Sequence, residues 1–344
     1  MIFYSFQDFL LVEPQECEQR KVFTPYSMLW KKFLTLHPER LIIQEFQGNI
    51  TKWFVPEDRK EVSEFITVPY HPYWSIPFGL TRMDRDFSSY DDTRNIPSID
   101  GSTRLSPYIR FGVFSIREIY QKFSPVIARN EAIQNVSGTW IASQARNDDT
   151  IKPSETLINE LIWREFWYHI AYYFPFTYDL EFQERKRCIV WNRNLSSDEW
   201  KQFAAGKTGY PLVDAAIRQL TLTNWMHNRL RMVVASFLTK NLGIDWRIGE
   251  KWFRKYLIDY DEAVNIGNWQ WSASVGADPK PVRIFNPLLQ SEKFAPEAKF
   301  IKKYIPELEN IDPKKIHSLD LSGIYYPPIV DQKESAREAR ERYR

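Results

Sequence analysis

The chain of 344 residues lacks the features that mark secreted and membrane proteins. It has only two cysteines, Cys17 and Cys188, so no disulfide framework is expected and a reducing compartment fits the composition. No apolar run approaches the roughly 20 residues that a membrane-spanning helix needs. The first residues lack the basic segment of a signal peptide. We therefore expect a cytoplasmic protein with no membrane attachment.

The chain also lacks an excess of charge of one sign. It lacks the common sequence motifs for binding nucleotides and metals as well. The net charge of +2 excludes a general attraction to polyanions, although a local basic face stays open. Gly206-Lys-Thr208 resembles the end of a phosphate-binding P-loop, but Lys201 stands where that motif needs its first glycine. Asp259 and Asp261 have no His or Cys cluster nearby, so no metal site is expected.

Aromatic residues, in contrast, are plentiful. They make up 16% of the chain and include 13 Trp, more than a core needs, because Leu, Ile and Val fill cores without an N–H to satisfy. An aromatic-rich helical core is one explanation. Another comes from Asp259, Asp261, Asn265, Trp269 and Trp271, which fall within 13 residues. Carboxylates and an amide can bind the edge of a flat heterocycle, and indoles can stack on it or pass electrons to it, so this stretch suits a redox cofactor.

Helix signals dominate the second half of the chain, and strand-like alternation is scarce after residue 100. Residues 25–34 predict a short amphipathic helix, residues 71–110 predict loops with short helices, and the polar stretch 124–150 predicts a surface insertion. The expected helix boundaries are a cap at Ser154 with a stop at Pro175, a capping box over Ser196–Glu199, Pro211 in a first turn, a helix from about Asn228 to Lys240 before Gly243, and a cap at Asp245. The sequence therefore predicts an all-helical domain over the C-terminal two-thirds.

Glu160, Trp163, Arg164 and Trp167 share one face of an expected helix. They could form a surface ion pair beside half-buried indoles. They could also form a pocket wall, in which Trp163 stacks on a planar ligand, Arg164 holds an anion and Glu160 binds a polar edge. A carboxylate in a strongly aromatic helix is costly to bury without a partner, which favours the pocket.

Two further groups of polar residues leave similar alternatives. Asn228 and Arg231 could face one cavity, or belong to a solvated basic stripe, while Arg229 would point elsewhere and His227 is more simply structural. Ser102, Thr103 and Ser106 on a loop that enters a helix could cradle a phosphate. Hydroxyl residues are also common helix caps, and capping alone is the simpler explanation of this third group.

Taken together, these motifs resemble those of the DNA photolyase/cryptochrome family, and most of all its microbial class I cyclobutane pyrimidine dimer photolyases. The matching stretches, in the family's order along nearly the whole chain, are 101–108, 159–166, 206–216, 225–232, 265–271 and 283–287. The resemblance implies a mainly α fold, with a photolyase-type all-helical FAD-binding domain over residues 71–344 and an inserted loop near 124–150. Residues 1–70 would be a remnant of the family's α/β antenna domain and the interdomain linker.

The resemblance also implies an activity, that of a deoxyribodipyrimidine photo-lyase. Photoexcited reduced FAD would give an electron to a flipped-out cyclobutane pyrimidine dimer, which splits. UV-damaged DNA, single- or double-stranded, would be the partner, and a monomer is expected. Because most of the antenna domain has no counterpart, the resemblance gives little support to an antenna pigment such as folate or deazaflavin.

The family's functional positions fall on residues of three kinds. Those implied to bind FAD are Tyr90, Ser102, Thr103, Leu105, Ser106, Asn228, Arg231, Asp259, Asp261 and Asn265. Those implied to hold the dimer or the damaged strand are Arg94, Glu160, Trp163, Arg164, Arg229, Met232, Trp271 and Arg283. Those implied to act in the chemistry are Glu160 and Asn265, together with the electron-transfer row Trp269, Trp246 and Trp191.

Two other functions stay open. One is a cryptochrome-like blue-light receptor. Asn265 argues against it, because many cryptochromes carry another residue there, and so do Trp163 and Trp271 in the implied dimer pocket. The other is a non-functional remnant of a photolyase, suggested by the missing antenna domain and the inserted segment. The stretch before Arg283 is one residue shorter than the family pattern, so a DNA-contacting loop there is expected to differ.

Overall fold

The computed structural model describes residues 9–41, 76–124, 155–277 and 282–344, and within these ranges the regular structure is helical apart from one isolated bridge between Asn192 and Ile244. The α-helices, in chain order, are α1 (Phe23–Leu36), α3 (Ile76–Met83), α4 (Tyr90–Thr93), α5 (Ser106–Arg110), α6 (Ile116–Phe123), α8 (Glu155–Tyr173), α9 (Asp198–Ala204), α10 (Pro211–Thr223), α11 (Asn228–Ser236), α12 (Trp246–Tyr256), α13 (Glu262–Ser272), α14 (Pro287–Phe294), α15 (Lys299–Tyr304), α16 (Pro313–Ser318) and α17 (Gln332–Arg342). The predicted mainly α fold is thus confirmed.

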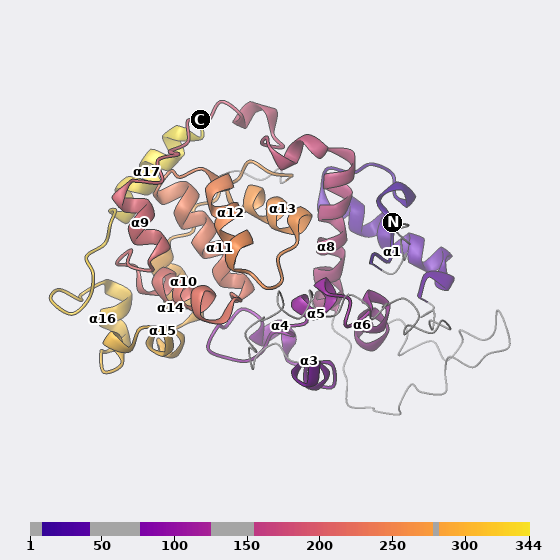
Figure 1. Cartoon of the computed structure of the whole chain (residues 1–344), viewed down its shortest axis with the longest axis horizontal. Helices are drawn as coiled ribbons and strands as arrows, with labels where there is room; N and C mark the ends of the chain where they lie inside the picture. The colour runs from indigo at the N-terminus through magenta and orange to yellow at the C-terminus, as the bar shows by residue number, and fades with distance from the viewer. Residues whose placement is uncertain (1–8, 42–75, 125–154, 278–281) are drawn as a thin grey trace, which may run out of the picture.

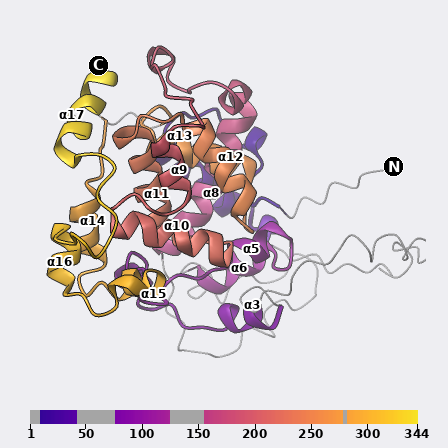
Figure 2. The same ribbon diagram turned by 60° about the vertical axis from the view of Figure 1, so that its left-hand side comes forward.

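The long helix α8 stands in the middle of the molecule (Figure 1). Helix α1 packs on one side of α8 and α13 on the other, while the short helices α3 to α6 lie near its N-terminal end. Figure 2 shows the last helices, α14, α16 and α17, along the outer side of the group formed by α10 to α13. Many of the site residues predicted from the sequence, those of α8 and of α11 to α13, therefore belong to central helices, and the others lie at α4 and α5 or in connecting segments.

Local capping chemistry explains several helix boundaries. Asp245 caps α12 by accepting the N–H of Arg247, Pro211 opens α10, and Gly243 adopts a positive φ of 64°, as glycine favours. These three predictions are confirmed. His227 is structural in part, as expected, because its side chain caps α11 by accepting the N–H of Arg229.

One boundary prediction was wrong, and one predicted helix changes its type before it ends. The cap of α9 is Ser197, whose hydroxyl accepts the N–H of Trp200, so the capping box over Ser196–Glu199 does not form. The helix predicted to run to Lys240 ends as α-helix at Ser236 and continues as a π-helical turn over Phe237–Asn241. The expected cap at Ser154 lies outside the described residues.

Two hydrophobic cores hold the helices together. The C-terminal core draws on buried side chains between Ile189 and Tyr343, from α9 to α17. The N-terminal core joins residues 11–41 to α5, α6 and α8. A buried carboxylate links its halves, because Glu165 of α8 accepts the N–H groups of Leu11 and Val12 and of the Trp30 indole.

The described part of the first 70 residues consequently packs as part of the helical body. Residues 9–41 hold α1 and two short 3₁₀ turns, and α1 lies against α8. The rest of residues 1–70, the insertion near 124–150 from residue 125 onward, and residues 278–281 of the shortened stretch lie outside the described residues. The domain boundary stays a prediction. In the described part of the chain, no helix is long and apolar enough to cross a bilayer, and no three His, Cys, Asp or Glu side chains group as metal ligands.

Candidate functional site

A polar cluster forms where α11 approaches the turn before α13. The carboxylate of Asp259, 8% exposed, accepts hydrogen bonds from Arg231 Nη2 at 2.8 and 3.1 Å and from Ser106 Oγ at 2.6 Å. Arg231 Nε also donates to the backbone oxygen of Met226 at 2.8 Å, which fixes the guanidinium. Three predicted cofactor-binding residues from distant parts of the chain are thus in direct contact. Asn228, in the first turn of α11, is exposed beside them.

Asp261 begins the helix that carries the other central residues. Its carboxylate caps α13 by accepting the N–H of Val264 at 3.2 Å, and it also accepts the hydroxyl of Tyr168 from α8. Burial and the neighbouring carboxylate of Asp261 raise the pKa of Tyr168 far above its usual value, so the phenol stays protonated as the donor. Tyr168 therefore ties α8 to the start of α13.

Asn265 lies one turn into α13 and is buried. Its Nδ2 donates to the backbone oxygen of Glu250 at 3.3 Å and to Glu250 Oε1 at 3.2 Å, and Tyr260 donates to the same Oε1 at 2.8 Å. This carboxylate from α12 fixes the amide with its nitrogen toward α12. Glu250 was not among the predicted residues, although an acid inside an amphipathic helix is a weak signal of such a role.

The loop of residues 100–106 is organised by an arginine that was not among the predicted residues. Arg82, 4% exposed, donates to the backbone oxygens of Ser102 and Thr103 and to Asp100. Thr103 Oγ1 accepts the N–H of Leu105 at 3.4 Å, and Leu105 is buried just before α5. The bonds to the loop carbonyls hold the backbone of this predicted cradle. Tyr90, at the start of α4, is buried in the same region of the fold.

Positive charge gathers beside this loop. The guanidinium groups of Arg104, Arg229 and Arg231 all lie close enough to His227 to act on it. Burial and then these three charges lower the pKa of His227 to about 4, so its ring is neutral near pH 7. Its Nε2 and the Nε of Arg104 are both buried without a hydrogen-bond partner. These two buried donors without partners lie beside the loop hydroxyls and the guanidiniums. Together they fit a ligand that carries phosphates and a polar heterocycle.

Residues predicted to contact DNA also meet, at the N-terminal half of α8. Arg94 forms an ion pair with Glu160, and the charges of both act on Arg229. Arg229 donates to Asn95 Oδ1 at 2.7 and 3.2 Å, and its guanidinium lies 4.5 Å from the ring centre of Phe294. Glu160 is therefore the acid partner within a basic group.

The two indoles predicted to hold a flipped base lie at the edge of the N-terminal core. Trp163 and Trp271 are partly buried against it, and Trp163 stacks on Phe23 of α1 with 3.6 Å between ring centres and an interplanar angle of 3°. One face of Trp163 is thus covered by the protein itself. Met232 is also partly buried, on α11.

Arg164 and Arg283 stand apart from this group. Arg164 Nη1 donates to the backbone oxygen of Phe9 at 2.9 Å, and its guanidinium lies over the ring of Phe9. It serves the packing of the N-terminal segment, which does not favour a contact with DNA. Arg283 has an exposed side chain, while its backbone oxygen accepts a hydrogen bond from the buried Lys240. Both roles in binding DNA stay predictions.

The three tryptophans of the predicted electron-transfer row all lie in the C-terminal core. Trp269 follows Asn265 by one turn of α13 and packs on Phe253 with 4.9 Å between ring centres. Trp246 begins α12 and Trp191 lies in the segment before α9; their indole N–H groups donate to one oxygen, Oε1 of Glu181. Glu181 was not predicted, because nothing in the local sequence of its loop signals a contact with α12.

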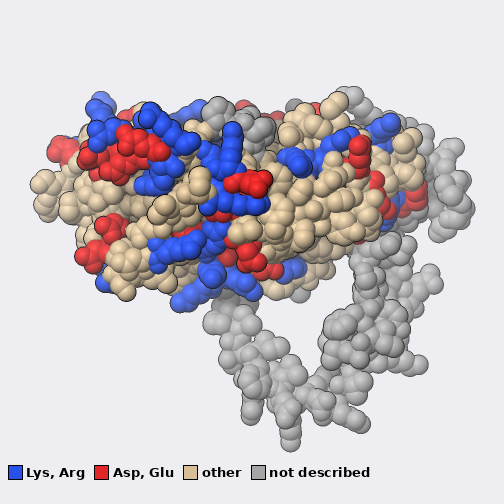
Figure 3. Space-filling view, turned by 90° about the horizontal axis from the view of Figure 1, so that it is seen from above, with Lys and Arg blue, Asp and Glu red and all other residues tan. Residues whose placement is uncertain are grey.

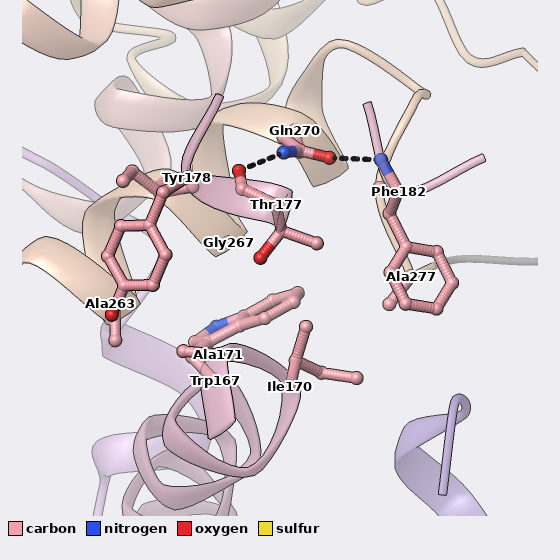
Figure 4. A pocket seen from close by; sticks show the side chains of 12 residues that line it. Trp167, Ile170, Ala171, Thr177, Tyr178, Phe182, Ala263, Gly267, Gln270 and Ala277 are labelled. Carbon is pink, nitrogen blue, oxygen red and sulfur yellow. Dashed lines mark hydrogen bonds between the residues drawn. The ribbon is translucent and has the colours of Figure 1, made fainter. Parts of the chain in front are cut away.

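An apolar pocket lies on another face of α13. It is an open pocket of about 310 Å³, a volume that includes the solvent at its mouth, between α8 and α13, and Figure 4 shows Trp167 and Ile170 on one side and Gln270 and Thr177 on the other. The amide of Gln270 is fully engaged, donating to Thr177 and Leu180 oxygens and accepting the N–H of Phe182. Each helical residue turns about 100°, so Asn265 and Trp269 point away from this pocket. It is separate from the polar cluster.

The surface carries both signs of charge. On the face shown in Figure 3, Lys and Arg side chains gather near the middle, with Asp and Glu side chains beside them and neutral surface between. This mixture agrees with the net charge of +2. Any attraction to a polyanion must therefore come from a local group such as that around Arg94 and Arg229, not from the whole surface.

The sequence and the structure were both compared with those of known proteins. Residues 157–344 match the FAD binding domain of DNA photolyase. The chain is 36% identical to a deoxyribodipyrimidine photo-lyase of Alkalihalophilus pseudofirmus over 98% of its own length and 71% of that protein, and 42% identical to the enzyme of the same name from a Synechococcus strain over 72% of its length and 49% of that protein. The structure resembles that of an archaeal photolyase from Sulfolobus tokodaii with two FAD molecules, with a TM-score of 0.76, 30% identity and coverage of 98% and 71% of the two chains. The chain therefore belongs to the DNA photolyase/cryptochrome family.

Proposed function

We propose that this protein is a class I deoxyribodipyrimidine photo-lyase, which uses FAD and light to split cyclobutane pyrimidine dimers in DNA. The observation that carries the proposal is the polar network around the buried carboxylate of Asp259, which accepts hydrogen bonds from Ser106 of α5 and Arg231 of α11. Tyr260, the next residue along the chain, and Asn265 of α13 both bind the carboxylate of Glu250. Such a network costs stability unless it serves a polar ligand or a fixed geometry. Membership of the photolyase family makes FAD that ligand.

The residues of the network would hold FAD in two ways. The loop of residues 102–106 and the guanidiniums near His227 would bind its phosphates, and Asn265, fixed by Glu250, would meet the edge of its flavin ring. Bound FAD, once fully reduced and excited by light, supplies the electron that opens the cyclobutane ring. The protein's part is to bind, to orient and to exclude water.

The dimer would enter beside α8 after leaving the DNA stack, since it cannot be reached inside a duplex. The exposed faces of Trp163 and Trp271 would stack on the two bases. Glu160, protonated and released from Arg94, would donate a hydrogen bond to the dimer and so stabilise the negative charge that develops on it. Arg94 and Arg229 would meet the phosphates on either side, which gives a salt-dependent affinity. UV-damaged DNA is thus the proposed partner, bound by a monomer.

The decisive experiment is repair of a thymine-dimer oligonucleotide by the full chain loaded with FAD and reduced chemically beforehand. FAD is the only pigment supplied, and each sample is compared with one kept in the dark. Splitting that requires light is the expected result. Bound flavin that is reduced by light without any splitting would instead support a cryptochrome-like receptor. Failure to bind FAD, or the lack of a cooperative thermal transition, would support a non-functional remnant.

Substitution of Trp163 tests the dimer pocket. Trp163→Ala should weaken binding of dimer-containing DNA by about 1–3 kcal/mol through lost stacking, while FAD stays bound. Phe23→Ala is the matched control, because it removes the same stacked pair from the α1 side and leaves the indole in place. Affinity is measured by titration with damaged and undamaged oligonucleotides. Equal losses in the two variants would assign Trp163 to packing alone.

A further inference from the structure

One buried carboxylate joins two of the tryptophans in the predicted electron-transfer row. Glu181 lies in the segment between the short turns Pro175–Tyr178 and Glu184–Lys186, and its side chain is 5% exposed. Its Oε1 accepts the indole N–H of Trp191 at 3.1 Å and that of Trp246 at 3.2 Å. The two indole nitrogens are therefore held within two hydrogen-bond lengths of each other by a single atom.

An arginine on the same helix as Trp246 holds this carboxylate in its charged form. Arg247 Nη1 and Nη2 each lie 3.0 Å from one oxygen of Glu181, and Nη1 also donates to Asp245. Burial alone would raise the pKa of Glu181, but the hydrogen bonds and charge of Arg247 bring it below its usual value. Glu181 is therefore ionised near pH 7 and able to accept a proton.

The charges around the two indoles differ. The guanidinium of Arg247 lies 4.5 Å from the ring centre of Trp246, where it opposes a positive charge on that ring. Trp191 has no such cation over its ring among the described residues, and it lies nearly perpendicular to the ring of Tyr343, with 6.0 Å between ring centres. Both indoles share the carboxylate, so a positive charge is better stabilised on Trp191 than on Trp246.

We propose that Glu181 is a positioning residue that directs positive charge to Trp191 and then takes the indole proton of Trp191. The inference rests on the proposed function and on the predicted electron-transfer row, in which Trp269, Trp246 and Trp191 would pass one electron to FAD excited by light. When Trp191 loses that electron, its Nε1–H bond breaks and the proton passes to Glu181 Oε1, leaving a neutral indole radical. A thiol reductant returns an electron, and the proton goes back from Glu181 to Nε1.

This step would slow the return of the electron to Trp191. An indole radical cation is far more acidic than indole, so a charged acceptor 3.1 Å away is well placed to deprotonate it. The return of the electron then requires the return of the proton as well. A purely structural role, in which Glu181 and Arg247 anchor the segment of residues 176–190 to α12, would hold the indoles in place without any proton transfer.

Glu181→Gln separates the two roles. The amide keeps the size of the side chain and an oxygen that accepts both indole N–H groups, but it carries no charge and cannot take the proton. In the FAD-loaded chain with an added thiol, light-driven reduction should slow by about tenfold. Flash photolysis should show a tryptophan radical that stays cationic and recombines, where the unchanged protein yields the neutral radical.

Glu165→Gln is the matched control. Glu165 is also buried and also accepts an indole N–H, that of Trp30, but it lies in the other core, so its loss should leave both signals unchanged. A second measurement uses the full chain without FAD, oxidised by a photogenerated ruthenium(III) tris-bipyridine complex. Without the flavin, the variant should again give the cationic radical and the unchanged chain the neutral one.

Failures of the two proposals are distinguishable. Enzyme that is reduced chemically beforehand does not need the tryptophan row for repair. A lack of repair by this enzyme would therefore count against the proposed function alone. A neutral radical formed equally fast in Glu181→Gln would overturn the inference while repair persists. If that variant does not fold, the test uses the unchanged chain in H₂O and in D₂O. The proposal requires that Trp191 loses its proton more slowly in D₂O. Equal rates in the two solvents would also overturn it.

Discussion

At the scale of single residues, buried imidazoles make the fold sensitive to acid. The pKa of His227 is lowered to about 4 by burial and by three nearby guanidiniums, against about 6.5 for an exposed histidine. Between pH 6.5 and 4, His227 is protonated in the unfolded chain and neutral in the folded chain. The contribution of neutral His227 to the free energy of unfolding is therefore fully present above pH 6.5. This contribution, about 3 kcal/mol, is lost as the pH falls from 6.5 toward 4.

His227→Asn tests this prediction. Asn is a good N-cap, so the variant keeps an acceptor for the N–H of Arg229 at the start of α11 but cannot be protonated. Urea unfolding at pH 7.5 and pH 5 should show a smaller loss of stability in the variant than in the unchanged chain. The control is His37→Asn, at an exposed histidine. An equal pH dependence in the variant and the unchanged chain would contradict the buried, neutral state of His227.

The site residues that could be predicted are those that belong to a local sequence motif. Ser106, Arg231 and Asp259 were predicted because each belongs to a recognisable motif, and the structure joins them directly. Glu181 and Glu250 were missed because their partners come from other elements, and no local pattern records such a contact. Tyr168 and Arg82 were missed for the same reason. Residues that position a site are thus harder to predict than those that form it.

At the scale of helices, the packing of α12 on α13 depends on a glycine. A Cβ at Gly249 would lie 2.2 Å from Cη2 of Trp269 and 2.6 Å from Cδ2 of Leu238. Ala favours helices over Gly by about 1 kcal/mol, but overpacking of a tight core costs about 1–3 kcal/mol. We expect Gly249→Ala to destabilise the protein by up to about 2 kcal/mol and to displace the indole of Trp269.

The measurement combines denaturant unfolding with the near-ultraviolet circular dichroism of the tryptophans. Lys251→Ala, at an exposed position of the same helix, is the control and should be close to neutral. A variant that is more stable than the unchanged chain would show that α12 can move away from α13 at no cost, and that the contact does not position Trp269.

Helix boundaries were predictable where one residue carries the signal. Asp245, Pro211 and Gly243 act through their own side chain or backbone, so their positions can be recognised without the fold. Ser196 and Ser197 are adjacent and equally suited to capping, so the choice between them depends on where α9 packs. The π-helical turn at Phe237–Asn241 has no local signal in the sequence at all.

At the scale of the whole molecule, the resemblance suggested that residues 1–70 are a remnant of another domain. The described part of that stretch completes the N-terminal core, in which Tyr26, Trp30 and Leu34 of α1 are buried with residues of α8, while the domain assignment itself stays a prediction. Glu165 is buried with three donors from this segment around its carboxylate, and burial raises its pKa to about 6. The segment is therefore expected to be needed for folding.

Deletion of residues 1–41 is the test. It would remove all three donors from Glu165, and breaking up a buried charged group of this kind costs about 3–5 kcal/mol. It would also expose the apolar face of α8, at about 1.5–3 kcal/mol for each large side chain uncovered. Together these losses approach the 5–15 kcal/mol that stabilise a typical domain, so the shortened chain should show no cooperative melting. Glu165→Gln in the full chain is the control and should only lower the melting temperature. A shortened chain that melts cooperatively at the temperature of the full chain would show that α1 is an appendage, and that the remaining helices are sufficient to fold.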